Sequence, residues 1–326
     1  MTTKEKLLEL LEKNRGKYVS GEEISNALAV SRTAIWKAIN SLRNEGYEIT
    51  AVQNKGYCLS NDTDILSVQG ITKYLDYPEN LDIQVYNTVD STNTMLKNLA
   101  TEGAKEGTCI IATEQTAGRG RIGRKFYSPS GTGVYLSLLL RPGDVPASKS
   151  INITTMAAVA VCMAIEDVTG KNPGIKWVND VFLDNKKVCG ILTEGALSME
   201  NGYLEYIVLG VGFNAYLPEG EGFPEELKQI AGAIYDSQVS EGKNLLAAKF
   251  LNHFQELYNE ADEKRYYEEY KKRCFVIGKA INVITPKETK KATAIDLDSE
   301  CHLIVKYENG EVEALSSGEI SVRVNE

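Results

Sequence analysis

Hydrophobic positions in the first 60 residues recur at helical spacing in three short segments. Four leucines between residues 7 and 11 give the first segment one apolar side, and Gly16 follows it as a stop signal. The second segment opens on Ser20-Gly21-Glu22-Glu23, which has the Ser-x-x-Glu spacing of a capping box, and extends to about Leu28. We therefore predict two short helices before residue 29.

The third segment has the signals of a helix followed by a hairpin. Ser31 is positioned as an N-cap, Ile35, Ile39 and Leu42 recur at helical spacing, and Gly46 ends the segment. Residues 47–59 then contain a turn, 54–57, between two short β-prone stretches. This order of elements is typical of a winged helix-turn-helix DNA-binding domain, which we place at residues 1–62.

Four side chains lie on the outer side of the first turns of the third helix. A recognition helix presents such positions to base edges and phosphates of DNA. The residues are Arg32, Thr33, Trp36 and Lys37. The alternative is a small helical cap on an enzyme, because basic residues on a helix usually only face water.

Residues from about 71 to 270 change to a mixed α/β pattern. The predicted strands are 83–89, 108–113, 134–140, 175–177, 181–183, 188–193 and 203–213. A long apolar helix is predicted over 155–168, an amphipathic helix over 245–258, and a tyrosine-rich helix near Tyr266. We assign 63–274 to this domain.

The last 50 residues are predicted to be all-β. Segments 280–285, 292–297, 303–307 and 311–315 alternate in the manner of strands, and Asn309-Gly310 is a strong hairpin signal. A small barrel over 275–326 would bury them. The chain as a whole is therefore predicted to be α+β.

Composition excludes several classes of protein. With 326 residues, 43% hydrophobic and 25% charged, the chain is long enough for two or three domains. No apolar run approaches the ~18 residues of a membrane span, so we expect a cytoplasmic protein without a membrane partner. The six cysteines form no C-x-x-C pair, which favours reduced thiols. Only two histidines are present, so a histidine metal site or catalytic triad is not expected, and any metal arrives with a substrate.

Charge is unevenly distributed along the chain. Residues 1–60 contain nine Lys or Arg and seven Glu, whereas the whole chain carries a net charge of −9. The negative net charge therefore argues against binding of nucleic acid along the whole chain. The N-terminal domain, however, has enough Lys and Arg for one of its faces to contact phosphates.

The glycine-rich segment 118–124, Gly-Arg-Gly-Arg-Ile-Gly-Arg, satisfies G-x-G-x-x-G. A dinucleotide fingerprint must open a helix, whereas aromatic, Pro and Gly residues follow here before another strand. We therefore predict a cationic loop that closes around an anion, with a solvated surface loop or a nucleic-acid contact as the alternatives. No G-x-x-x-x-G-K-[ST] motif of a P-loop occurs.

A predicted hairpin brings a lysine beside this loop. Segment 176–180, Lys-Trp-Val-Asn-Asp, leads into a strand, the chain turns at Asp184-Asn185, and it returns through Lys187. A lysine projected into a cleft would neutralise a substrate carboxylate and an α-phosphate as they approach each other.

Taken in order, these motifs resemble the bifunctional biotin operon repressor and biotin-protein ligase family over nearly the whole chain. The segments that carry the resemblance are Asp90-Ser91-Thr92-Asn93, 114–124, 176–180, Lys187 with 190–192, 210–214 and 318–321. The resemblance implies a class II synthetase-like ligase domain and an SH3-like C-terminal domain. Val178 stands where the family usually has proline and Phe126 where tryptophan is common; neither change removes a reacting group.

The resemblance also implies roles for individual residues. Biotin would be contacted by Ser91, Thr92, Asn93, Gln115, Arg119, Gly120, Arg121 and Lys187. The ATP or adenylate would be contacted by Gly118, Arg121, Asn179 and Asn214. Lys187, Arg119, Arg121 and Asp180 would serve catalysis, with Asp180 orienting the lysine that attacks.

The implied reaction joins biotin and ATP into biotinyl-5′-AMP and transfers biotin to a lysine of a biotin carboxyl carrier protein, with Mg²⁺ carried by ATP. The adenylate would also act as corepressor for a homodimer on operator DNA. Two alternatives stay open: a ligand-sensing repressor without transfer activity, and a lipoate-type ligase.

Overall fold

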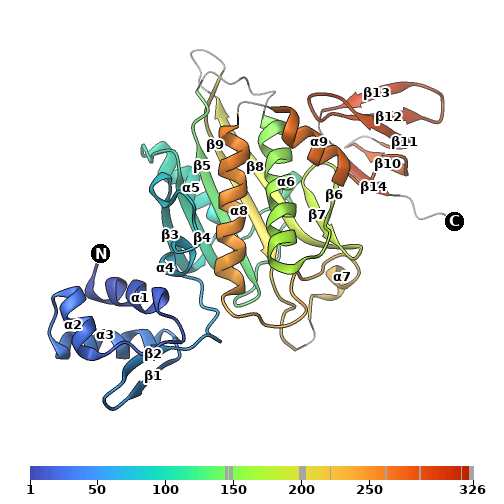
Figure 1. Cartoon of the computed structure of the whole chain (residues 1–326). Helices are drawn as coiled ribbons and strands as arrows, with labels where there is room; N and C mark the ends of the chain where they lie inside the picture. Colours follow the sequence, from blue (N-terminus) through green and yellow to red (C-terminus); the bar gives the residue numbers. More distant parts are fainter. Residues whose placement is uncertain are drawn as a thin grey trace. The chain divides into compact units, whose positions relative to one another are not determined.

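The computed structural model describes residues 1–143, 146, 150–197, 203–220, 222–260, 263–285, 288–316 and 318–322. The chain divides into two compact units, each formed by two stretches of sequence (Figure 1). The first unit comprises Met1–Pro78 and Ser237–Lys249, and the second comprises Glu79–Asp236 and Phe250–Glu326. The second boundary therefore lies inside one helix, α8 (Gly242–Asn259).

The first unit contains the predicted winged helix. Its elements are α1 (Thr3–Lys13), α2 (Gly21–Leu28), α3 (Arg32–Asn44), β1 (Ile49–Val52) and β2 (Gly56–Leu59). The capping box is confirmed, because Ser20 accepts from the Glu23 amide and the Glu23 side chain accepts from the Ser20 amide. Ser31 caps α3 as predicted. The inward positions Ile35, Ile39 and Leu42 are buried in one apolar core with the leucines of α1.

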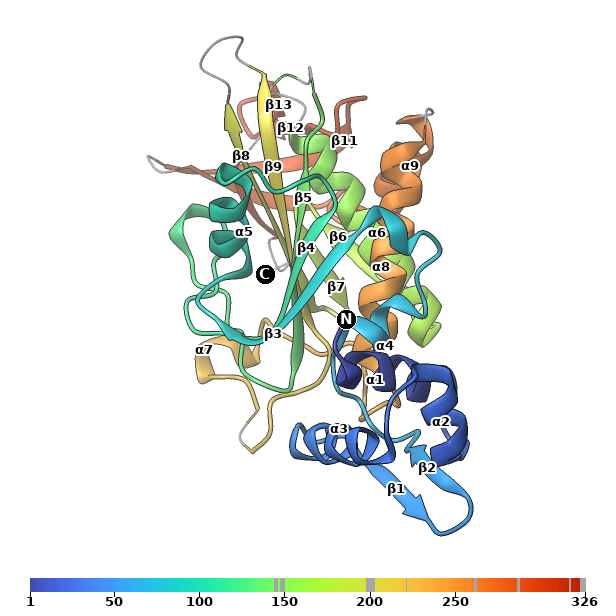
Figure 2. The ribbon, with the colours of Figure 1, turned by 90° about the vertical axis from the view of Figure 1, so that its left-hand side faces the viewer.

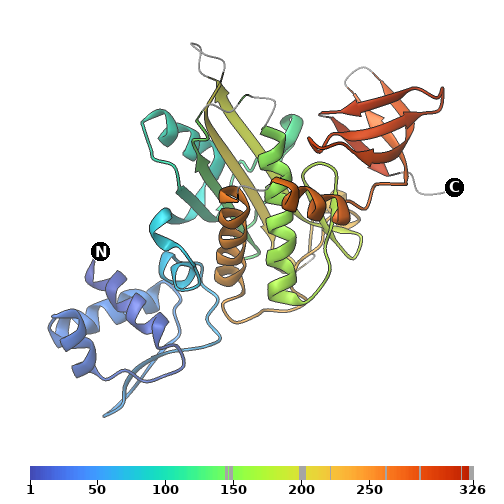
Figure 3. The same cartoon turned by 45° about the horizontal axis from the view of Figure 1, so that its top comes forward.

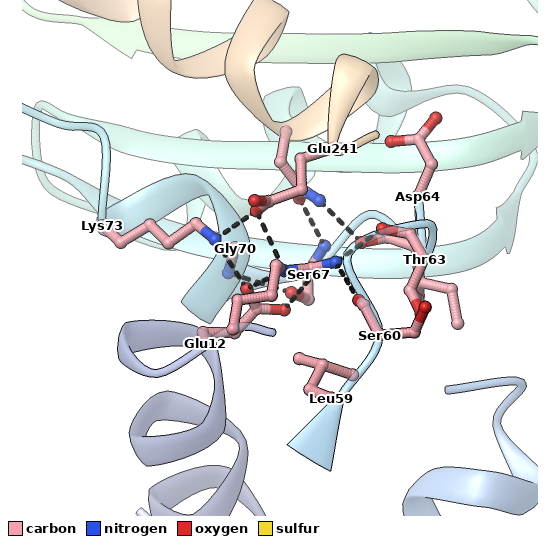
Figure 4. A network of polar contacts seen from close by, with 12 residues as sticks. Glu12, Leu59, Ser60, Thr63, Asp64, Ser67, Gly70, Lys73 and Glu241 are labelled. Atoms are coloured by element: carbon pink, nitrogen blue, oxygen red, sulfur yellow. Dashed lines mark hydrogen bonds and ion pairs between the residues drawn. The ribbon is translucent and has the colours of Figure 1, made fainter. Parts of the chain in front are cut away.

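The first unit also contains α4 (Val68–Thr72) and the first turns of α8. Glu12, Arg15, Lys73 and Glu241 form a charge cluster there. Figure 4 shows Glu12, Lys73 and Glu241 pointing toward one another. Glu12 accepts from Arg15 at 2.8 Å and from Lys73 at 2.8 Å. None of the four side chains is more than 13% exposed. Since a buried charge is stable only beside its partners, the cluster fixes α1, α4 and the start of α8 together.

The second unit is built on a seven-stranded sheet with the order β3-β4-β5-β9-β8-β7-β6. Only β3 and β4 are parallel to each other, and the other neighbours are antiparallel. The strands are β3 (Asp82–Val89), β4 (Thr108–Gln115), β5 (Gly133–Leu140), β6 (Gly174–Lys176), β7 (Asp180–Leu183), β8 (Lys186–Leu197) and β9 (Leu204–Asn214). All seven predicted strands are present.

Helices cover both faces of this sheet (Figure 2). On one face α5 (Thr92–Thr101) buries Leu96 and Ala100 against Ile110, Leu139 and Val208. On the other face lie α6 (Ser150–Thr169) and the part of α8 from Phe250 onward, where Phe250 contacts Phe213. Helix α5 was not predicted, and it begins at the motif that the resemblance had singled out. The short α7 (Glu225–Lys228) was also not predicted.

Helix α6 corrects one prediction. By length and composition it is apolar enough to cross a membrane, contrary to the expectation that no segment would be. However, 67% of its apolar window is buried inside the second unit, as in the core helix of a globular domain.

The C-terminal part of the second unit is a five-stranded antiparallel sheet with the order β13-β12-β11-β10-β14 (Figure 3). Its strands are β10 (Ala280–Ile284), β11 (Thr289–Leu297), β12 (Leu303–Tyr307), β13 (Val312–Leu315) and β14 (Glu319–Val322), of which β14 was not predicted. Helix α9 (Glu263–Arg273) precedes it. The Trp177 indole donates to the Cys301 carbonyl at 3.0 Å, which joins this sheet to the segment after β6.

Candidate active site

A pocket lies where the N-terminal end of α5 meets β8, β9 and the arginine loop, our name for residues 118–124. The structure brings all eight predicted biotin-contacting residues together around it. They are Ser91, Thr92, Asn93, Gln115, Arg119, Gly120, Arg121 and Lys187. This pocket holds about 60 Å³.

Hydrogen bonds fix the side-chain amides of Asn93, in α5, and Gln115, at the end of β4. Ser91 caps the helix. The Thr92 amide donates to Gln115 Oε1 at 2.9 Å, and Gln115 Nε2 donates to Ser128 Oγ at 2.9 Å. Asn93 is buried, with Nδ2 donating to the Leu192 carbonyl and Oδ1 lying 2.6 Å from Ser137 Oγ. Both amide side chains are therefore held in one orientation.

A second polar group involves Glu194, which was not predicted. Its carboxylate accepts from Asn93 Nδ2 at 2.9 Å and from Lys97 Nζ at 2.9 Å, and lies 3.2 Å from Arg119 Nη2. Burial opposes ionisation of Glu194, but the hydrogen bonds from Asn93 and Lys97 and the charge of Arg119 outweigh burial and lower its pKa. A lone glutamate in a strand gives no sequence signal, so only its place in the fold reveals it.

The predicted hairpin places Lys187 beside Asp180. The turn at Asp184 and Asn185 has positive φ at both residues, as a two-residue hairpin turn requires. Lys187 Nζ then lies 2.6 Å from Asp180 Oδ1. Asn179 connects this pair to the arginine loop, because its Oδ1 accepts from Arg121 at 2.9 Å while its Nδ2 donates to Asp180 at 3.1 Å.

Glycines in β8 and β9 leave room for side chains that line the pocket. A Cβ at Gly212 would lie 2.5 Å from the Phe126 ring, and one at Gly210 would lie 2.1 Å from Asn93 Oδ1. A Cβ at Gly190 would meet both Phe126 and Lys187 at 3.0–3.2 Å. The aromatic ring at position 126 therefore packs directly on the bare backbone of the sheet.

The arginine loop does not open a helix, which confirms the rejection of a dinucleotide fingerprint. It contains only a short turn, Arg121–Gly123, and it closes on itself because Gly120 N donates to the Arg124 carbonyl and Phe126 N to the Gly118 carbonyl. The side chain of Ile122 is 72% exposed.

A larger cavity of about 370 Å³ shares five residues with the first pocket: Gly120, Arg121, Phe126, Asn179 and Lys187. Asp180, which was predicted to orient the acceptor lysine, and Asn214, which was predicted for the nucleotide, also line it. Gly318 and Ile320 reach it from the segment that contains β14, and Phe223, Leu227 and Ile230 reach it from around α7. Sequence reasoning missed the α7 residues because they belong to no motif.

The recognition-helix candidates lie in the first unit and are solvent-exposed. Arg32, Thr33, Trp36 and Lys37 all face outward, and the Trp36 side chain is 57% exposed. A large exposed aromatic group on a basic helix face is suited to contact a partner.

Three parts of the chain match known families. Residues 3–58 match a helix-turn-helix domain, 85–214 match the biotin/lipoate A/B protein ligase family, and 276–323 match the biotin protein ligase C-terminal domain. A biotin protein ligase from Aquifex aeolicus, solved in complex with biotin and ATP, is 25% identical with a TM-score of 0.61. The match covers 75% of this chain and 99% of that structure.

Curated relatives match over almost the full length. The bifunctional ligase/repressor BirA of Bacillus spizizenii is 36% identical over 320 residues, which are 95% of each chain. The protein of the same name from Escherichia coli is 29% identical and covers 98% of this chain and 96% of its own. These matches confirm the resemblance predicted from the motifs, and the chain belongs to the family of bifunctional biotin ligase/repressors.

Proposed function

We propose that this chain makes biotinyl-5′-AMP from biotin and ATP, transfers the biotin to a lysine of a biotin carboxyl carrier protein, and represses transcription when the adenylate is bound. Membership of the family makes it an ATP-dependent biotin ligase with a helix-turn-helix repressor domain. The observation that carries the finer proposal is the convergence of Lys187, Arg119 and Arg121 on two adjoining cavities.

Biotin occupies the smaller pocket. The Ser91, Thr92, Asn93 and Gln115 side chains supply polar groups for its ureido head, and Phe126 supplies an apolar wall. Arg119, Gly120 and Arg121 of the arginine loop line the same pocket. We assign this loop to open when biotin enters and to close over the bound ligand.

The nucleotide occupies the larger cavity, which Asn179, Asn214 and Arg121 line together with Lys187. Gly118 is assigned to the backbone turn that places Arg119 and Arg121, and it does not line either cavity. Lys187 lines both cavities, so its ammonium group can lie between a carboxylate in one and an α-phosphate in the other.

In the first step a carboxylate oxygen of biotin attacks the α-phosphorus of ATP. The new O–P bond forms as the bond from the α-phosphorus to the β-phosphate oxygen breaks, and pyrophosphate leaves. Lys187 and Arg121 lower the repulsion between the two anions and align them. No group among the described residues has to act as a covalent nucleophile.

In the second step the amine of the acceptor lysine attacks the acyl carbon of the adenylate. The C–O bond to AMP breaks, the amine loses a proton, and an amide forms. Asp180 is assigned to orient this amine. Closure of the arginine loop keeps water from the anhydride until the acceptor arrives.

Mg²⁺ is assigned to the phosphates of ATP. Among the described residues no group of three or more His, Cys, Asp or Glu is arranged to hold a metal ion. When bound, the ion would neutralise charge on the leaving pyrophosphate.

Repression is assigned to Arg32, Thr33, Trp36 and Lys37 on α3. Two copies of the winged helix in a homodimer would read the two halves of a palindromic operator. We assign the protein to the cytoplasm, where ATP and the carrier protein are both available. The domain boundaries 1–62, 63–274 and 275–326 remain a prediction.

Two rival functions differ in measurable ways. A repressor without transfer activity would bind biotin and leave the carrier protein unmodified. A lipoate-type ligase would modify its acceptor with lipoate in preference to biotin. The complete set of Lys187, Arg119 and Arg121 around the cavities favours the biotin ligase.

The test is to incubate the protein with biotin, MgATP and a biotin carboxyl carrier domain and to follow the mass of the acceptor. We expect biotin on one lysine with the wild type and none with Lys187→Ala. Lys171→Ala is the matched control, because Lys171 pairs with the exposed Asp236 outside both cavities. Equal transfer by Lys187→Ala would contradict the assigned role, and transfer of lipoate alone would replace the substrate.

A further inference from the structure

Glu194 is an acidic side chain among groups assigned to bind anions. It lies in β8 and its side chain is 21% exposed. An anionic group is unfavourable beside a site that receives a carboxylate and a triphosphate, unless cations neutralise it. Here Lys97 and Arg119 supply two positive charges within 3.2 Å. The net charge of the three groups is therefore still positive.

The partners of Glu194 come from two kinds of structure. Asn93 and Lys97 belong to α5, which packs on the sheet, whereas Arg119 belongs to the glycine-rich arginine loop. The Glu194 carboxylate is thus a bridge from the rigid α5 and β8 to a segment whose backbone has little side-chain packing of its own.

The orientation of Asn93 does not depend on the charge of Glu194. Asn93 Nδ2 also donates to the Leu192 carbonyl, and Asn93 Oδ1 lies against Ser137. A glutamine at position 194 can still accept from Asn93 through its amide oxygen. The contact that requires a carboxylate is the ion pair with Arg119.

We propose that Glu194 is a positioning residue that tethers Arg119 and thereby holds the arginine loop over the biotin pocket. The proposal rests on the proposed function, because it takes that pocket as the biotin site. Arg119, Gly120 and Arg121 line the pocket while the tether is formed, so the tether favours the closed arrangement of the loop. Keeping a loop near its bound arrangement raises affinity by reducing the entropy lost on binding.

The tether has a bounded effect. Arg119 is 46% exposed, so solvent screens its ion pair with Glu194. We expect Glu194→Gln to weaken biotin binding about two- to fivefold, to release biotinyl-5′-AMP faster by a similar factor, and to leave kcat at saturating biotin within about twofold. A side chain needed only for folding would not produce this split between KM and kcat.

The test is a double-mutant cycle with the full chain, in which biotin affinity is measured by titration calorimetry. The variants are Glu194→Gln, Arg119→Gln and the double variant. If Glu194 acts through Arg119, the double variant binds biotin no more weakly than Arg119→Gln alone. Lys97→Met is the matched comparison, because Lys97 contacts the same carboxylate from α5 and is not part of the loop. It should change biotin affinity less than twofold.

Each other outcome overturns the tether. Additive effects of the two substitutions would show that Glu194 acts independently of Arg119. If Lys97→Met weakened biotin binding as much as Glu194→Gln, Glu194 would act only through the packing of the cluster. Unchanged or tighter binding by Glu194→Gln would also exclude it. Failure of the wild type to bind biotin would instead contradict the proposed function, so the two failures are distinguishable.

Discussion

Lys187 and Asp180 form an ion pair in which Lys187 Nζ lies 2.6 Å from Asp180 Oδ1, across the antiparallel pair of β7 and β8. Resemblance to the family assigned Asp180 to the acceptor lysine of the second step. The contact gives Asp180 a second role, since it also holds the side chain that is assigned to the first step. The two roles predict different kinetics.

Asp180→Asn should slow both half-reactions. Loss of a charged hydrogen bond, worth about 1.5–3 kcal/mol, would let Lys187 move and should slow adenylate formation roughly tenfold or more. Pyrophosphate release in a single turnover without acceptor measures this step alone. Asp236→Asn, which removes the partner of Lys171 on the surface, is the control. If only the transfer step fell, the ion pair would have no part in adenylation.

Two glycines of the arginine loop should respond differently to alanine. A Cβ at Gly118 would lie 2.4 Å from the Phe126 carbonyl oxygen and 2.6 Å from Ser128 Oγ, so Gly118→Ala has to displace the loop. At Gly120 the nearest atom would be the Arg124 carbonyl oxygen at 3.4 Å, and φ is −119°. Gly118→Ala should raise the KM for biotin at least tenfold.

Gly120→Ala should change the KM for biotin less than about threefold. Steady-state rates of adenylate formation at varied biotin concentrations give this KM for both variants. A similar loss in both would mean that the loop needs glycine for mobility and not for the close approach to Phe126 and Ser128.

Much of the fold followed from local signals. Ser20, Glu23 and Ser31 set helix starts that the structure confirms, because a cap depends only on neighbouring backbone groups. Helix α5 was missed although Ser91 caps it, since Thr92, Asn93 and Thr94 carry polar side chains at its start. Thr92 and Asn93 line the pocket and hydrogen-bond with the buried Ser137, so tertiary contacts override their weak helix propensity.

The site was predictable only as far as its motifs extend. The arginine loop and Lys187 stand out by residue type, and the structure places them together. Glu194 and Lys97 do not, because their significance lies in distances between α5, β8 and the loop that no sequence spacing encodes. The pairing of Lys187 with Asp180 depends likewise on strand register.

Loss of a positive charge from α3 should weaken operator binding and spare ligation. Arg32 is exposed on α3 and lies outside both cavities. If it contacts a phosphate, Arg32→Ala should lower the slope of log K against log salt by about one. Lys13→Ala removes the same charge from α1, where Lys13 pairs with Glu9, and should leave the slope unchanged. Equal slopes for Arg32→Ala and the wild type would remove Arg32 from the interface.

Tyr47 should make the winged helix sensitive to alkaline pH. Burial raises the pKa of Tyr47 to about 12, above the value of about 10 in an unfolded chain. The folded state therefore keeps the proton longer, so the stabilisation is present below pH 10 and is lost as the pH rises toward 12. Tyr47→Phe lacks this proton. It should be less stable than the wild type at pH 8, because it loses the polar contact between the Tyr47 hydroxyl and Ser67.

At pH 11 the difference in free energy of unfolding between the two proteins should be smaller. Only in the wild type is the unfolded state stabilised by ionisation of Tyr47. Thermal melts followed by circular dichroism at both pH values measure the two differences. A difference that is constant between pH 8 and pH 11 would show that Tyr47 does not titrate with unfolding.

The buried charge cluster should make the first unit depend on Glu12. Its side chain is 1% exposed and balances Arg15 and Lys73, so Glu12→Gln leaves two cations facing Glu241 alone. Breaking a buried pair by removing one partner costs about 3–5 kcal/mol. Glu9→Gln on the same helix removes a surface pair with Lys13 and should cost about 0.5 kcal/mol or less.

Hydrogen exchange of the α1, α2 and α3 amides in the full chain measures both losses, because those amides report on opening of the first unit. We expect protection to fall by about two to four orders of magnitude in Glu12→Gln, to change little in Glu9→Gln, and to stay unchanged in the β5 and β9 amides of the second unit. Equal protection in the two variants would show that the cluster adds no net stability. In that case its desolvation would cost as much as its ion pairs return, and Lys73 and Glu241 would serve only to align α4 with the start of α8.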